Sequence, residues 1–169
     1  RGILPSNTTA GETSWAWVPP TVPSPIDNGP AVPGDDTQPA WSARLVTRNA
    51  ISLVFPLPIS YAQKVRQVEG VASVSWGNWF GGIYVTESNF FPQFAIDGPT
   101  YLDMYPEFIL SPAERKAFLT DRQGAIVGES LARRHGWKIG DTIPLQATIF
   151  PTKGSNDWSF TLRGIYVVE

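Results

Sequence analysis

Residues 124–147 constrain the fold most strongly, because they predict a strand, a helix and a second strand joined by tight turns. GAIVG at 124–128 is a short apolar run bounded by glycines, and ESLARRH at 129–135 has helical character. Gly140-Asp141 is typical of a turn, and TIPLQATIF at 142–150 alternates apolar and polar residues as a half-buried strand does. The segment therefore indicates a domain in which short helices and strands are mixed.

The rest of the chain supports the same class. Ser60 with Gln63, and Ser111 with Glu114, have capping-box spacing and predict two further helices. In the first of these helices we expect Tyr61, Val65 and Val68 on one face and Gly70 as the C-terminal cap. One helical turn is expected at 99–106. Strands are expected at 43–48, 71–76, 79–85, 90–97 and 158–168. This pattern predicts an α+β fold with short helices packed on a mixed, mostly antiparallel sheet.

The first 40 residues differ in composition from the remainder of the chain, since they hold eight of the 16 prolines and few charged residues. Prolines at this density remove backbone donors and favour extended conformations. We predict an irregular, proline-rich linker or arm at 1–40, which Trp15 and Trp17 could fasten to the domain and which need not be native to it. The folded domain is expected at 41–169, truncated at its C-terminal end because the last strand is followed by no closing element.

Charge and cysteine content exclude several functions. The net charge of −2 gives no overall attraction to nucleic acid or to an acidic membrane surface. The chain has no cysteine, which excludes disulfides and thiolate zinc sites. It also has no apolar run of the length that spans a bilayer.

Ser130 is a candidate nucleophile, because residues 128–132 are one glycine short of the G-x-S-x-G elbow. The only histidine, His135, lies five residues further along the same expected helix. Five residues rotate a helix by roughly 500° and advance it by about 7.5 Å, so the two side chains point to different faces. A serine hydrolase needs its base within about 3 Å of the serine oxygen. We therefore expect Ser130 or Glu129 to cap the helix instead.

Other charged residues in this region also have structural interpretations. Arg133 and Arg134 predict a solvated face in the last helical turn, where they oppose the helix dipole. No Lys-Ser/Thr follows the loose G-x-x-x-x-G pattern, so a phosphate-binding loop is not supported.

The carboxylates of Asp97, Asp103 and Glu107 are close in sequence and could form an acid–base pair. However, Asp97 precedes a Gly-Pro turn and Asp103 falls at the start of a helix, which favours structural roles. With one histidine and no cysteine, neither a transition-metal site nor a cofactor is expected.

A cluster of aromatic residues surrounds the glycine pair at 81–82. Most of these rings should be core residues. If Trp79 and Phe80 project from a glycine-rich hairpin, they form with Trp76 a candidate contact patch for another protein.

Three blocks of sequence are more specific than any of these patterns: LPISYAQKVRQVEGVASVSWGNWFGG at 57–82, FAIDGPTYLDMYPE at 94–107 and GAIVGESLARRHGWKIGDTIPL at 124–145. From about Arg44 to residue 166, the chain resembles the periplasmic core domain of MacB-like and FtsX-like ABC transporter permeases. In the third block the glycines, Leu131-Ala132 and Gly140-Asp141 match the family pattern vvG-x-x-LA-x-x-x-G-x-x-x-GD-x-I-x-L in spacing.

The resemblance implies a non-catalytic domain inserted between two transmembrane helices of an inner-membrane permease, on the periplasmic side. Its implied partners are a cytoplasmic ATPase, acting through the permease, and a periplasmic protein or a hydrophobic substrate. The full-length protein could act as a homodimer, and the ATP site would lie elsewhere. Members of the family export compounds, extract lipoproteins or transmit signals.

Two alternatives remain open from the sequence. One is a secreted hydrolase that uses Ser130 or a carboxylate pair, which a pocket holding Ser130 beside Asp97 or Asp141 would favour. The other is a free-standing extracytoplasmic binding module tethered by the proline-rich arm.

Overall fold

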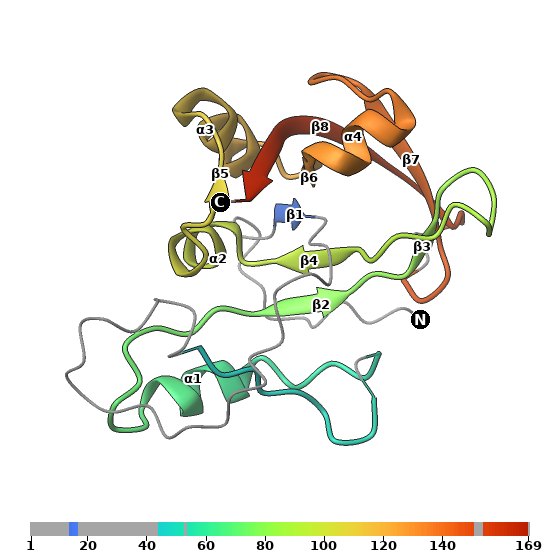
Figure 1. Ribbon diagram of the computed structural model, residues 1–169. Helices are drawn as coiled ribbons and strands as arrows, with labels where there is room; N and C mark the ends of the chain where they lie inside the picture. The colour runs from blue at the N-terminus through green and yellow to red at the C-terminus, as the bar shows by residue number, and fades with distance from the viewer. Residues whose placement is uncertain (1–13, 17–43, 53, 151–153, 169) are drawn as a thin grey trace.

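The computed structural model describes residues 14–16, 44–52, 54–150 and 154–168, and this part of the chain is an α+β protein (Figure 1). The four helices are α1 (Ser60–Arg66), α2 (Gly98–Met104), α3 (Pro112–Thr120) and α4 (Glu129–His135). The strands are β1 (Ser14–Ala16), β2 (Gly77–Trp79), β3 (Gly82–Ile83), β4 (Phe94–Ile96), β5 (Phe108–Ile109), β6 (Gly124–Gly128), β7 (Thr142–Ala147) and β8 (Asp157–Val168).

All the described strands belong to one mixed sheet. The order along it is β2-β4-β1-β6-β8-β7-β3, and β5 pairs with the far end of β8. The pairs β1–β6 and β6–β8 are parallel, and the other five described pairs are antiparallel. The prediction of a mixed, mostly antiparallel sheet with short helices is therefore confirmed.

Strand β1 lies within the segment for which we predict a proline-rich linker or arm. Its residues pair antiparallel with β4 and parallel with β6, so Trp15 stands opposite both Ala95 and Ala125. Residues 14–16 thus form an internal strand of the sheet. Residues 1–13 and 17–40 of the predicted arm lie outside the described residues.

The core forms two clusters on opposite faces of β6. Ala125 and Val127 belong to the cluster that includes Leu131 of α4, whereas Ile126 belongs to the cluster that includes Phe118 of α3. Every residue of β6 is buried. Because successive side chains of a strand point to opposite faces, a strand covered on both faces is apolar throughout, and GAIVG has this composition.

Because of a register shift in its pairing with β6, strand β8 contributes side chains to both core clusters. Ala125 pairs with Leu162 and Ile126 pairs with Gly164, so Arg163 is the extra residue. An extra residue reverses the faces beyond it. Accordingly, Leu162 lies in the α4 cluster and Tyr166, four positions later, lies in the α3 cluster.

The predictions for the middle of the chain are confirmed in detail. Ser111 caps α3, its hydroxyl accepts the Glu114 amide, and the Glu114 carboxylate accepts the Ser111 amide. The strand at 124–128, the helix at 129–135 and the turn at Gly140 all form where the sequence places them. These elements are specified by local capping and turn signals, which need no distant partner.

The predictions for two strands before residue 77 are wrong. Residues 44–48 are irregular, and Leu45 and Val46 are 94% and 80% exposed. Residues 71–76 are also irregular, and pairing with β4 begins only where the Asp97 amide donates to the Trp76 carbonyl, 3.1 Å away. Alternation of residue types does not make a strand without a partner to accept its backbone hydrogen bonds.

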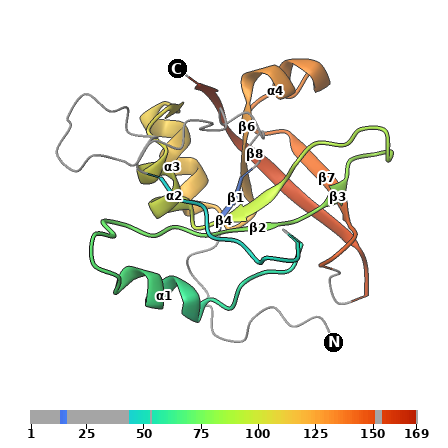
Figure 2. The same ribbon diagram turned by 60° about the horizontal axis from the view of Figure 1, so that its bottom comes forward.

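Helix α1 begins at Ser60 as predicted, but its capping box does not form. Ile59 occupies the N-cap position with helical backbone angles, and no side chain caps the helix. No residue of α1 is buried, and Tyr61 and Val68 of the predicted apolar face are exposed. Gly70 has the left-handed conformation (φ +86°), although α1 ends at Arg66, before it. In both views α1 lies beyond β2, on the opposite side of the molecule from α4 (Figures 1 and 2).

Candidate functional site

The start of α4, where the candidate nucleophile lies, is an exposed helix terminus. Gly128 is the N-cap residue, and no side chain makes a capping hydrogen bond, so the prediction that Ser130 or Glu129 caps the helix is wrong. Ser130 is exposed. Glu129 pairs with Arg133 at 3.1 Å along the helix surface, and Arg134 is also exposed, as predicted for a solvated face.

The ring of His135 serves as a packing element on the other side of α4. It stacks on Trp137, with 4.6 Å between ring centroids, and meets Tyr84 edge-on at 5.2 Å. Trp137 in turn donates its indole N–H to the Tyr84 hydroxyl at 3.1 Å. Burial and the neighbouring Arg134 guanidinium lower the pKa of His135, which favours the neutral ring. His135 therefore joins α4 to an aromatic cluster, away from Ser130.

The glycines that follow α4 set the geometry of the turn into β7. Gly136 caps the helix in the left-handed conformation (φ +68°), and Gly140 has φ +97°. The Asp141 carboxylate accepts the Lys138 amide at 2.8 Å. The Gly140 amide donates to Leu162 of β8 at 2.7 Å, which ties the turn to the sheet. These residues hold backbone in place and present no reactive group.

The three predicted carboxylates each have a different partner. Asp97 precedes α2 and accepts the Thr100 hydroxyl at 2.7 Å. Asp103 pairs with Arg115 of α3 at 2.5 Å, and Glu107 pairs with Arg44 at 2.6 Å. The structure therefore does not bring them together as an acid–base pair.

The aromatic hairpin presents less surface than predicted. Phe80 is 1% exposed, and it packs against Phe150, Trp158 and Phe160. It is a core residue and cannot be part of a contact patch. Trp76 and Trp79 are half-buried, and Trp79 packs edge-on against Phe94, with 5.3 Å between centroids.

Gln93 is a site residue that the sequence did not reveal. Its buried amide accepts the Gly82 N–H at 2.6 Å and donates to the Gly82 carbonyl at 3.0 Å. Both of its polar atoms are thus used to satisfy the backbone beside β3. Gln93 also lines a small apolar cavity of about 30 Å³ next to Phe80 and Trp137. Drug-sized ligands occupy pockets of about 300–1,000 Å³, so this cavity is too small to be one.

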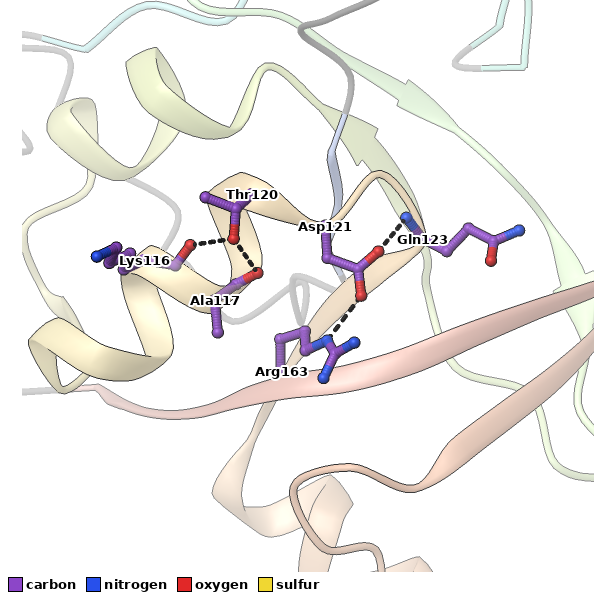
Figure 3. A network of polar contacts seen from close by, with 6 residues as sticks. All are labelled: Lys116, Ala117, Thr120, Asp121, Gln123 and Arg163. Carbon is purple, nitrogen blue, oxygen red and sulfur yellow. Dashed lines mark hydrogen bonds and ion pairs between the residues drawn. The ribbon is translucent and has the colours of Figure 1, made fainter.

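The most developed polar network of the described chain joins α3 to the bulge in β8. Figure 3 shows the Asp121 carboxylate accepting the Gln123 amide at 2.9 Å and Nε of Arg163 at 2.7 Å. In the same view the Thr120 hydroxyl donates to the carbonyls of Lys116 and Ala117 at the end of α3. At the start of α3, the Glu114 carboxylate accepts the Ile165 amide of β8 at 3.1 Å.

These hydrogen bonds shift two carboxylate pKa values. Burial raises the pKa of Asp121, but the Gln123 amide and the Arg163 guanidinium outweigh it and bring the pKa below its usual value. For Glu114 the hydrogen bonds from Ser111 and Ile165 likewise outweigh burial, and its pKa is lowered. The lowered pKa values favour the ionised form of both carboxylates, and both accept hydrogen bonds from neighbouring groups. These features are typical of carboxylates with a structural role.

The described residues include no candidate metal site and no membrane-spanning helix. Among them, no cluster of three or more His, Asp or Glu side chains could hold a metal ion. None of the helices in these ranges has the length and apolar character needed to cross a membrane. Comparison of the chain with models of protein families, with curated proteins and with solved structures found no match.

Proposed function

We propose that this chain is a non-catalytic extracytoplasmic domain of an inner-membrane ABC transporter permease of the MacB-like or FtsX-like type. Such a domain couples motion driven by a cytoplasmic ATPase to export, lipoprotein extraction or signalling, through contacts with a periplasmic protein or a hydrophobic substrate. Because β1 belongs to the sheet, the preceding membrane helix is expected before Ser14.

The proposal rests on the structural roles of the residues that match the family pattern in the third block, at 124–145. Leu131 and Ala132 are buried under the sheet, and Gly136 and Gly140 adopt positive φ angles. These four residues therefore supply the packing of α4 and the two turns of the β6–α4–β7 unit. A unit of this kind suits a domain that transmits force, because a packed element moves as one body.

The arrangement around Ser130 supports a non-catalytic role. Asp97 lies before α2 and Asp141 lies in the turn before β7, each with its own backbone or side-chain partner. The small cavity is lined by neither of them and not by Ser130. A hydrolase would need a base and an orienting group within hydrogen-bonding distance of the serine.

The topology of the full-length protein tests the proposal. These 169 residues contain no cysteine, so Ser130→Cys introduces the one thiol of this domain, on the exposed surface of α4. Any cysteine elsewhere in the full-length protein is first replaced by serine. In intact cells with a permeabilised outer membrane, a membrane-impermeant maleimide should label this variant without lysis of the inner membrane. A cysteine in a cytosolic protein of the same cells is the control and should react only after lysis.

Two results would contradict the proposal. One is labelling of Ser130→Cys only after lysis. The other is recovery of the full-length protein in the soluble fraction, with no membrane-associated ATPase co-purifying from detergent extracts.

A further inference from the structure

The exposed apolar side chains of the described chain are concentrated in one segment, residues 45–68. This segment makes up about a fifth of the described residues, yet it contains eight of the fourteen large apolar side chains that are exposed. They are Leu45, Val46, Ile51, Val54, Phe55, Ile59, Tyr61 and Val68. Single exposed apolar residues are ordinary on a protein surface, but eight within one segment favour a contact site there.

The charges of residues 45–68 have one sign. Arg48, Lys64 and Arg66 lie in the segment, and it contains no Asp or Glu. The whole chain has a net charge of −2, so its overall charge conceals this local excess of three positive charges. Exposed apolar side chains combined with cations are the composition of elements that lie in the interface of an anionic membrane.

Contacts near both ends attach the segment to the rest of the chain, and most of the side chains between them are exposed. At one end, Arg44 pairs with Glu107 at 2.6 Å, and at the other, Arg66 donates to the Val74 carbonyl at 3.3 Å. Helix α1 buries no residue. In both views α1 lies beyond β2, on the opposite side of the molecule from α4 (Figures 1 and 2). Its apolar side chains are therefore held outward from the domain.

Two backbone amides of the irregular part are satisfied locally. The Asn49 side-chain oxygen accepts the Ile51 amide at 2.9 Å, and the Ser52 hydroxyl accepts the Val54 amide at 3.1 Å. Local pairing of this kind matters at a bilayer, because an amide that leaves water must keep a hydrogen-bond partner.

We infer that residues 45–68 bind the surface of an anionic lipid bilayer. The apolar side chains enter the boundary between headgroups and acyl chains, and Arg48, Lys64 and Arg66 contact lipid phosphates. A second copy of the chain fits the segment less well, because a two-fold interface would set three cations against the same three cations. The inference rests on exposure and charge and does not depend on the proposed transport function.

Sedimentation with vesicles tests the charge requirement. The 169-residue chain should bind vesicles that contain phosphatidylglycerol, bind phosphatidylcholine vesicles more weakly, and lose the difference at high salt. Arg48→Gln with Lys64→Gln should weaken binding to the anionic vesicles by about fivefold per cation removed. The matched control is Arg133→Gln with Arg134→Gln, which removes two exposed cations from α4 and should leave binding unchanged.

Two apolar substitutions and a fluorescent label test insertion. Phe55→Ser should weaken binding about tenfold, whereas Ile139→Ser, at an exposed apolar residue outside the segment, should not. A polarity-sensitive dye on Phe55→Cys should shift to the blue on addition of anionic vesicles. The same dye on Ser130→Cys should not respond, because residue 130 belongs to α4, which lies on the opposite side of the molecule from α1 (Figure 1).

Absence of binding to anionic vesicles at low salt would overturn the inference, as would equal binding by Phe55→Ser. Self-association in solution, without lipid, that is lost in Phe55→Ser would identify a second copy as the occupant and would also overturn it. The circular dichroism spectrum of each variant should match that of the parent, because every substituted side chain is exposed.

Discussion

Arg44 and Glu107, 63 positions apart in sequence, form an ion pair with 2.6 Å between Nη1 and Oε1. The Arg44 guanidinium also lies over the Tyr105 ring, 4.5 Å from its centroid, and donates to the Met104 carbonyl. The two charged side chains are only 14% and 23% exposed. This junction holds the first residues of the exposed segment against the end of α2.

Separate and combined Arg44→Gln and Glu107→Gln substitutions should reveal a coupling free energy of about 1–2 kcal/mol, because the pair is shielded from water. Urea denaturation measures it through a double-mutant cycle. The more exposed Arg115–Asp103 pair is the control and should couple by less than about 0.5 kcal/mol. Equal coupling in the two pairs would contradict the assigned role of burial.

Gln93→Leu should lower the free energy of unfolding by about 2–3 kcal/mol. The substitution leaves the buried N–H and carbonyl of Gly82 without partners, and each unsatisfied buried group is costly. Gln123→Leu, at an exposed side chain, is the matched control and should change stability by less than about 0.5 kcal/mol. A small loss in Gln93→Leu would mean that the Gly82 groups find other partners.

Acidification should destabilise the protein through Asp121 and Glu114. Their pKa values are lowered in the folded chain from ordinary values of 3.8 and 4.5, so the unfolded chain binds protons first as the pH falls. The stability that they contribute is complete above about pH 5 and is lost as the pH falls through the folded pKa values. Thermal unfolding from pH 6 to pH 3 should show a shallower decline in Asp121→Asn than in the parent, and parallel curves would refute the assignment.

Gly124→Ala should destabilise the fold by about 1–3 kcal/mol. A Cβ at Gly124 would lie 2.9 Å from the Asp121 carbonyl oxygen, which also accepts the Gly124 amide, so backbone would have to move. Gly77→Ala, where the nearest atom would be 3.4 Å away, serves as the control and should be tolerated. Chemical denaturation of both variants decides the matter, and equal stability would show that the turn before β6 adjusts freely.

Local signals account for the part of the fold that the sequence predicts. The capping box of Ser111 with Glu114 and the turn glycines after α4 specify geometry within a few residues, and those elements form as expected. The strands at 43–48 and 71–76 fail because alternation does not identify a pairing partner. Strand β1 was not predicted, because proline content is an average over the first 40 residues and gives no information about the three residues that form the strand.

In the candidate site, too, features set by neighbouring residues were predicted and features set by tertiary contacts were not. Spacing along a helix correctly predicts that Ser130 and His135 act apart, because both residues belong to α4. The role of Phe80 depends on Phe160 of β8, which comes from a distant part of the sequence. The role of Gln93 depends on Gly82 of β3, which a loop brings back to it. Aromatic content alone therefore left Phe80 as a candidate for the contact patch, although it is buried.

The position of β1 has a consequence for how the protein folds. Strands β4 and β6 do not pair with each other, and β1 joins them although it comes from the start of the chain. Closing so long a loop costs chain entropy before any strand contact repays it. We expect β6, β7 and β8 to assemble early and the joint at β1 to close late, as a slow kinetic phase during refolding.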